Sequence, residues 1–168
     1  MRDAVGSTWI FSLVLSFTLI FAGFLVLALS YSKAYKIKNE MTSMIEKYEG
    51  ITNTDASANH RGSLMIINQY LTNSGYSTMG RCPVGSYGAN DLTANTLIAI
   101  TNSNSREDFY YCISKSTVNQ GKCSTIFEVT VFYNFNLPVL GQLSEYSIKG
   151  QTNEVVGAYF LDNEPLNC

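Results

Sequence analysis

The sequence has few charged side chains. Asp, Glu, Lys and Arg make up 14% of its 168 residues, against roughly 25% in an average soluble protein. The formal net charge is −2, from 11 Lys and Arg against 13 Asp and Glu. Nucleic-acid binders need a clustered positive surplus to contact phosphates. This balance excludes a strongly basic binding protein, and we expect no nucleic-acid partner.

The sequence also lacks the motifs of common catalytic and cofactor sites. Its single histidine, His60, lies in a polar stretch beside Arg61, so a centre built from several imidazoles is excluded. There is no Gly-x-Gly-x-x-Gly, no phosphate-binding loop, no Gly-x-Ser-x-Gly and no acidic calcium loop. The acidic pairs at 107–108 and 162/164 stand in turn-like or terminal contexts, which is typical of solvated charges. We predict a non-enzymatic protein with no catalytic residues, no cofactor and no metal site.

Charge is missing altogether between Ala4 and Ser32. Within that stretch, residues 9–31 read WIFSLVLSFTLIFAGFLVLALSY, and a membrane-spanning helix needs about 20 such residues. Trp9 and Tyr31 stand at its two ends, where amphipathic rings favour the headgroup layer. We predict one uncleaved span in the cell membrane. A buried core helix and a signal peptide cut after residues 28–30 are the alternatives. A core helix would show an amphipathic period, which this run lacks. A signal peptide would have a shorter apolar run.

A helical pattern continues beyond the apolar run. Apolar side chains recur at spacings of three and four, and no Pro or Gly interrupts them before Gly50. They are Ala34, Ile37, Met41, Met44, Ile45 and Tyr48. We predict one helix over residues 8–49 that spans the membrane and continues as an amphipathic stalk. Residues 1–7 would then be a short cytoplasmic or leader segment.

Residues 50–168 are predicted to form an extracytoplasmic α+β domain. A second helix is expected from Asp55 or Ser57, either of which could cap it, to Asn73, with Leu64, Ile67 and Leu71 on its apolar face. A Gly- and Pro-rich irregular stretch follows. Strands are expected at 92–101, 109–114, 126–137, 142–150 and 153–161, and the third of these alternates most clearly. Helices followed by a meander imply an antiparallel sheet with helices on one face, and the stalk is its natural cover.

The four cysteines help to predict which side of the membrane the domain occupies. Lys33, Lys36 and Lys38 follow the span and favour a cytoplasmic domain. An even number of cysteines favours disulfides in an oxidising compartment, and on balance we place the domain outside. The cysteines are Cys82, Cys112, Cys123 and Cys168.

Three disulfide connectivities are open to four cysteines. Cys112 and Cys123 flank a polar loop between two strands, so we predict that they pair, which leaves Cys82 with Cys168. Buried free thiols are the alternative; the spacings favour neither zinc nor a redox motif. The many Asn residues include no Asn-x-Ser/Thr acceptor, which favours a bacterial origin.

Small residues recur every seven positions in the apolar run. Ser16, Gly23 and Ser30 therefore fall on one helical face, with Ser12 and Ala22 adjoining. Small residues in line let helices approach closely in lipid. This face is a candidate for packing with other membrane helices; chance placement is the alternative.

An apolar helix that continues into a stalk on an antiparallel sheet resembles the plan of type IV pilin-like proteins. The C-terminal part, FEVTVFYNFNLPVLGQLSEYSIKGQT, is similar to minor pseudopilins of tight-adherence (Tad-type) pili, whose alternating strand is followed by a proline-containing break. The matching residues are Val129, Val131, Tyr133, Phe135, Pro138 and Gly141. The resemblance implies a structural subunit of a bacterial pilus or secretion apparatus. Its partners would be the lipid bilayer and, through the N-terminal helix, other pilin-like or assembly-platform subunits.

One departure from the pilin pattern concerns processing. Pilin leaders of this kind end in Gly, with Glu at the fifth position after the cut. Gly6 is the candidate end of a leader here, but Phe11 stands at that fifth position. The sequence therefore favours a subunit that initiates or decorates a pilus, or stays in the membrane. A membrane-anchored extracellular binding or sensor domain unrelated to pili is the alternative function.

Overall fold

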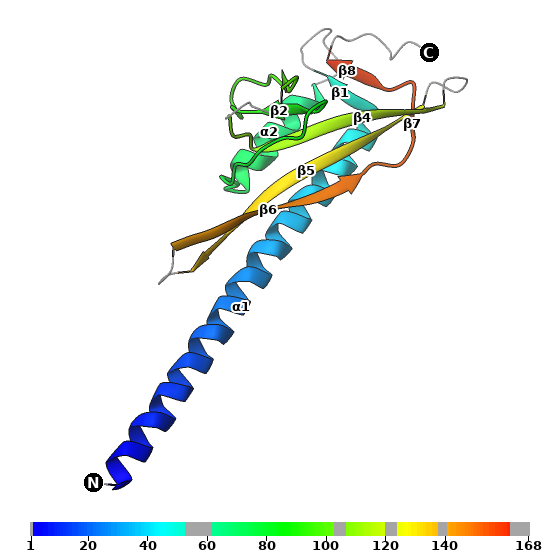
Figure 1. The fold of residues 1–168 in the computed structure, drawn as a ribbon. Helices are drawn as coiled ribbons and strands as arrows, with labels where there is room; N and C mark the ends of the chain where they lie inside the picture. Colours follow the sequence, from blue (N-terminus) through cyan, green and yellow to red (C-terminus); the bar gives the residue numbers. More distant parts are fainter. Residues whose placement is uncertain (1, 53–61, 103–106, 120–123, 138–140, 162–168) are drawn as a thin grey trace.

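The computed structural model describes residues 2–52, 62–102, 107–119, 124–137 and 141–161 (Figure 1). One long helix, α1 (Arg2–Lys47), runs into a domain that contains a second helix, α2 (Ser63–Asn73). The strands are β1 (Gly50–Thr52), β2 (Tyr87–Ala89), β3 (Ile98–Ala99), β4 (Tyr111–Asn119), β5 (Ser124–Leu137), β6 (Gly141–Gln151), β7 (Val155–Val156) and β8 (Tyr159–Leu161). This α+β layout, a long N-terminal helix with a C-terminal antiparallel sheet, confirms the coarse prediction.

The two halves of α1 have different surroundings. The first half projects away from the domain, whereas the second half lies along the sheet (Figure 1). Ala34, Ile37, Met41 and Ile45 are buried in the core, at the three- and four-residue spacing of one helical face. Glu49 and Gly50 then adopt positive φ values of 56° and 126°, which ends the helix where the sequence predicts. The stalk is therefore part of the domain's core.

The main sheet has the order β3-β2-β4-β5-β6, with β7 paired to β5, and its pairs are antiparallel. The alternation in β5 holds, because Phe127, Val129 and Val131 are all buried in the same core cluster as α1. Strand β6 comes very close to α1. A Cβ added at Gly150 would lie 2.5 Å from Cδ of Lys38, so a larger residue there would push the Lys38 side chain aside.

The short strands differ from the sequence predictions. The predicted strand 92–101 shortens to β3, and β2 lies in the stretch expected to be irregular. The predicted last strand is divided into β7 and β8 because Gly157, at φ 68°, turns the chain between them. Strand β8 then pairs in parallel with β1, which the sequence had assigned to a loop. Strands of two or three residues carry too little alternation to be seen in a sequence.

Helix α2 begins later than predicted. Gly62 has an extended backbone (φ −53°, ψ 131°), so the described helix starts at Ser63 rather than running through from Asp55 or Ser57, which lie outside the described residues. Its expected apolar face is confirmed, since Leu64, Ile67 and Leu71 are fully buried. The Ser63 hydroxyl donates a hydrogen bond to the carbonyl of Gly50 over 2.9 Å and accepts one from the amide of Thr52 over 3.0 Å. These bonds tie α2 to β1.

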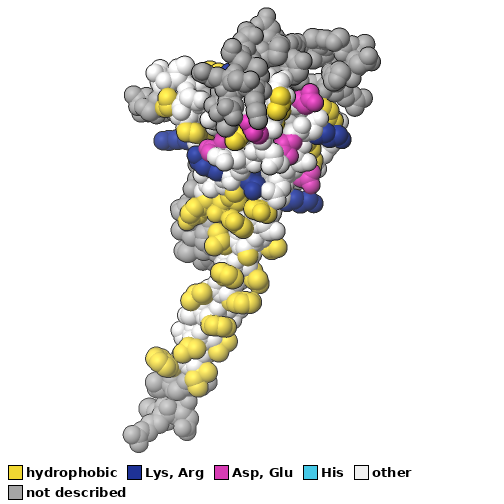
Figure 2. Space-filling model, turned by 90° about the vertical axis from the view of Figure 1, so that its right-hand side faces the viewer, with side chains coloured by type: hydrophobic (Ala, Val, Ile, Leu, Met, Phe, Trp, Pro, Cys, Tyr) yellow, Lys and Arg dark blue, Asp and Glu magenta, His cyan; other side chains and the backbone are white. Residues whose placement is uncertain are grey.

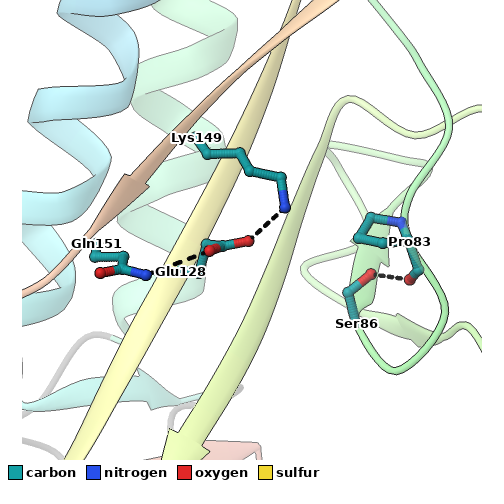
Figure 3. Close-up of polar contacts among 5 residues, drawn as sticks. All are labelled: Pro83, Ser86, Glu128, Lys149 and Gln151. Atoms are coloured by element: carbon teal, nitrogen blue, oxygen red, sulfur yellow. Dashed lines mark hydrogen bonds and ion pairs between the residues drawn. The ribbon is translucent and has the colours of Figure 1, made fainter.

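Two further sets of polar contacts lie on β5 and β6 and in the turn before β2. Lys149 Nζ lies 2.8 Å from Glu128 Oε1, and Gln151 donates to the other carboxylate oxygen over 3.4 Å (Figure 3). The hydrogen bond from Lys149 lowers the pKa of Glu128, although an exposed pair of this type contributes at most about 1 kcal/mol. The Ser86 hydroxyl donates to the Pro83 carbonyl over 2.6 Å and closes the turn before β2.

The core also contains a buried polar network. The Tyr111 hydroxyl donates to Asn68 Oδ1 over 2.8 Å, and Asn68 Nδ2 donates to Asn95 Oδ1 over 3.1 Å. Burial raises the pKa of Tyr111. The neutral phenol is therefore favoured in the folded state. Its contribution to the free energy of unfolding is complete below the pKa of tyrosine in the unfolded chain, about 10, and declines as the pH rises beyond that value.

Tyr111→Phe should lower the free energy of unfolding by about 1–2 kcal/mol, because it leaves the buried oxygen of Asn68 without this donor. Urea unfolding at neutral pH measures the loss, and Tyr110→Phe, at the neighbouring and less buried position, is the matched control. Above pH 10 the gap between wild type and Tyr111→Phe should narrow. A gap that widens with pH would contradict the assignment.

Candidate functional site: the apolar helix and its junction with the sheet

The projecting part of α1 is the largest exposed apolar feature of the described chain. Trp9, Phe17, Ile20 and Phe24 are each more than half exposed, and so are most of their apolar neighbours. Figure 2 shows hydrophobic side chains along the projecting helix, while the coloured charged side chains on that face lie on the domain. The helix is long and apolar enough to cross a membrane. Exposed apolar surface of this size marks an interaction site for lipid or protein.

The small-residue face is a continuation of the face that packs on the sheet. Ser16, Gly23 and Ser30 are seven residues apart, and Ala34 and Met41 follow Ser30 at spacings that keep to the same side of a helix. Ser16 is exposed, Ser30 is half-buried, and Gly23 is buried within the chain itself. The part of this face that is open to another helix therefore lies toward Ser12 and Ser16.

Four tyrosines meet where α1 enters the domain. The ring centroids of Tyr31 and Tyr133 are 5.9 Å apart, those of Tyr133 and Tyr146 are 5.4 Å apart, and Tyr31 stacks on Tyr35 at 6.2 Å. Burial raises the pKa of Tyr133. We call Tyr31, Tyr35, Tyr133 and Tyr146 the tyrosine cluster.

Of this cluster, the sequence predicted an interfacial position only for Tyr31, and it marked Tyr133 solely as part of the alternating strand. Tyr133 and Tyr146 come together because they are directly paired in the β5–β6 register, and a single sequence does not show which residues two strands place opposite each other. The sequence signals that pointed toward the cluster were the end of the apolar run and the alternating strand, each of which contains a tyrosine.

Lysines surround the tyrosine cluster. Lys38 Nζ lies 4.3 Å from the ring centroid of Tyr35, and Lys33 Nζ donates to the carbonyl of Gly75 over 3.1 Å. A hollow of about 190 Å³ lies beside Lys33 and Tyr133. It is smaller than the cavities of roughly 300–1,000 Å³ that hold typical small ligands. The junction thus combines amphipathic rings and cations instead of enclosing a ligand.

The disulfide pairing inferred from the sequence is wrong. Cys82 is bonded to Cys112, with Sγ atoms 2.00 Å apart. Cys112 therefore does not pair with Cys123, and Cys82 does not pair with Cys168. Strand β4 continues from Cys112, opposite Thr130, as far as Asn119, opposite Ser124. Strands β4 and β5 thus remain paired well beyond Cys112, so Cys112 does not lie beside the connection between them.

Cys82 reaches Cys112 because Cys112 also faces Gly88 of β2, on its other side. Any Cβ at Gly88 would lie 3.0 Å from the Cys82 sulfur and 2.4 Å from the Phe109 ring. The bond thus fixes the segment before β2 to the sheet. Cys123 and Cys168 lie outside the described residues.

The remaining candidates from the sequence form no chemical centre in the described part of the chain. Glu107 and Asp108 are exposed, as expected of solvated charges. His60, Asp162 and Glu164 lie outside the described residues. Within the described ranges, no three His, Cys, Asp or Glu side chains are grouped so that they could hold a metal ion.

These features define a class of protein. It consists of a disulfide-crosslinked α+β domain on an apolar helix that is long enough to cross a membrane. Comparison with protein families, curated proteins and solved structures finds no match.

Proposed function

We propose that the chain is a non-enzymatic, single-pass membrane subunit of a bacterial Tad or type IV-like pilus or secretion apparatus, built like a minor pilin. The observation that carries the proposal is the unbroken helix α1. Its first half is apolar and exposed, and its second half supplies Ala34, Ile37, Met41 and Ile45 to the core of the sheet domain. A helix shared in this way holds the domain rigidly relative to the membrane, as a structural subunit requires.

The disulfide supports a domain on the extracytoplasmic side. Bonds such as Cys82–Cys112 persist in oxidising compartments and are rare in the cytoplasm. The lysines after the apolar run favour the opposite orientation. We give the disulfide more weight, because a reducing compartment would remove a bond that fixes part of the domain, whereas the charge bias across the span is small.

The proposed partners are other pilin-like or assembly-platform subunits that pack against α1. The exposed small residues Ser12 and Ser16 let a second helix approach closely in lipid, where packing drives association. With Gly6 as the end of a leader, Phe11 stands at the position where type IV pilin-like proteins have a glutamate. This supports a subunit at the tip, at the base or in the membrane, since a core filament position would call for that acid.

Ser16→Leu should weaken association with partner subunits about fivefold, because a bulky side chain on the small face costs about 1 kcal/mol of helix packing. Crosslinking in native membranes, followed by quantification of the co-purified subunits, measures the effect. Ala28→Leu is the matched control, since Ala28 is exposed and lies on the far side of the helix.

Equal recovery of partners with both variants would contradict a role for the small face. The wider proposal predicts that the co-purified proteins include a secretion ATPase complex or other short anchored chains, encoded beside this gene. A gene that stands alone, with no such proteins recovered, would instead favour an anchored binding or sensor domain.

A further inference from the structure

We propose that the domain rests directly on the bilayer, with the tyrosine cluster in the headgroup layer at the level where the adjacent parts of β5 and β6 lie beside α1. This inference depends on the proposed membrane anchoring and adds the position and orientation of the domain. It identifies an interaction surface whose partner is a phospholipid headgroup region.

In the described chain, no free stalk separates the apolar run from the domain. Tyr31 is the last residue of that run, and its ring already packs edge-on against Tyr133 of β5. Ala34, one turn further on, is buried in the core. The domain therefore begins at the level at which the apolar run ends.

Strands β5 and β6 point toward the N-terminal half of α1. Along α1, the amide of Asn153 contacts Glu46, Gly150 lies against Lys38, and the Tyr133–Tyr146 pair lies at Tyr31. Strand β6, traced backwards from its end, thus descends toward the N-terminal half of α1. Figure 1 shows the far end of β5 and the start of β6 projecting beyond the other strands in that direction.

The length of the apolar run matches the thickness of a bilayer. Residues 9–31 span roughly 33 Å as a helix, close to the ~30 Å of a hydrocarbon core. With Trp9 at one interface, Tyr31 reaches the other. Strand β5 continues from Tyr133 to Leu137, which is up to roughly 13 Å at the rise of a strand. The described end of β5 therefore reaches the level of the headgroup region.

The chemistry of the junction fits a headgroup layer. Tyr31, Tyr35 and Tyr146 are each nearly half exposed, and tyrosine rings are enriched at membrane interfaces because one end is apolar and the other polar. Lys33 and Lys36 are exposed beside them, and cations at this level attract phosphate groups. If the domain did not contact the bilayer, these half-exposed rings would leave a partly apolar surface in water.

Tryptophan fluorescence in liposomes tests the proposal. Trp9 is the only tryptophan, so Trp9→Phe supplies a silent background for Tyr146→Trp in the full-length chain. Val156→Trp in the same background is the control, because Val156 is 65% exposed and pairs near the opposite end of β5. The vesicles contain phosphatidylcholine and phosphatidylglycerol with bromine on the upper acyl carbons. An intact Cys82–Cys112 bond confirms that each variant folds.

We expect the bromolipids to quench at least half of the emission from position 146 and almost none of that from position 156. No quenching at 146 would overturn the proposal, and so would equal quenching at both positions. Trp9 of the wild-type chain reports separately on anchoring. Quenched Trp9 with an unquenched reporter at 146 would refute only the resting position of the domain, whereas unquenched Trp9 would refute the anchoring itself.

Discussion

Met41→Ala should lower the free energy of unfolding by about 3 kcal/mol, within the range for truncating a fully buried methionine. Met41 has no exposed surface and lies on the face of α1 that packs on the sheet. Its loss removes buried apolar area and leaves a cavity between helix and sheet. Urea unfolding in detergent micelles, followed by the circular dichroism of the domain, measures the change.

The matched control is Met65→Ala in α2, where the same side chain is 47% exposed. Both substitutions place alanine in a helix, so their effects on helix propensity cancel. We expect the control to cost less than about 1 kcal/mol. Similar small effects at both positions would mean that the second half of α1 is not part of the domain's core.

Removing the Cys82–Cys112 disulfide should cost about 3–4 kcal/mol. The bond joins residues 30 positions apart, and closing a loop of that length restricts the unfolded chain by about this amount of free energy. Cys82→Ala, Cys112→Ala and the double variant should all lose nearly the same stability, because each removes the same single bond. Single losses that add up in the double variant would show that the two cysteines act separately.

Peptide mapping without reductant gives an independent check on the same bond. A crosslinked pair of peptides that contains Cys82 and Cys112 is expected. A Cys112–Cys123 pair would restore the connectivity inferred from the sequence and would contradict the structure.

The features that the sequence predicted correctly are those that repeat over many residues. The three- and four-residue spacing from Ala34 to Ile45 predicted both the helix and its buried face, and the alternation from Phe127 to Val131 predicted the central strand. Each pattern extends over several turns or strand residues, so its period identifies the element. A single apolar run was likewise enough to identify a helix of membrane-spanning length.

The features that the sequence missed depend on contacts between distant segments. The β1–β8 pair joins residues 50–52 to residues 159–161, and neither segment is long enough to show a period. The Cys82–Cys112 disulfide forms because β2 and β4 are neighbours in the sheet, and the spacing between cysteines does not reveal which strands are neighbours. The tyrosine cluster likewise depends on the register that sets Tyr133 opposite Tyr146.

We propose above all that the disulfide-bonded domain lies on the extracytoplasmic side of the membrane, on an uncleaved membrane helix. Labelling of intact cells with a membrane-impermeant maleimide tests it most directly, in a Cys123→Ala/Cys168→Ala variant that retains only Cys82 and Cys112. The account predicts no labelling until an impermeant reductant is added, and then labelling of both thiols on a chain that stays with the membranes. Thiols that react without reductant, and only after the cells are lysed, would place the domain in the cytoplasm and contradict the account.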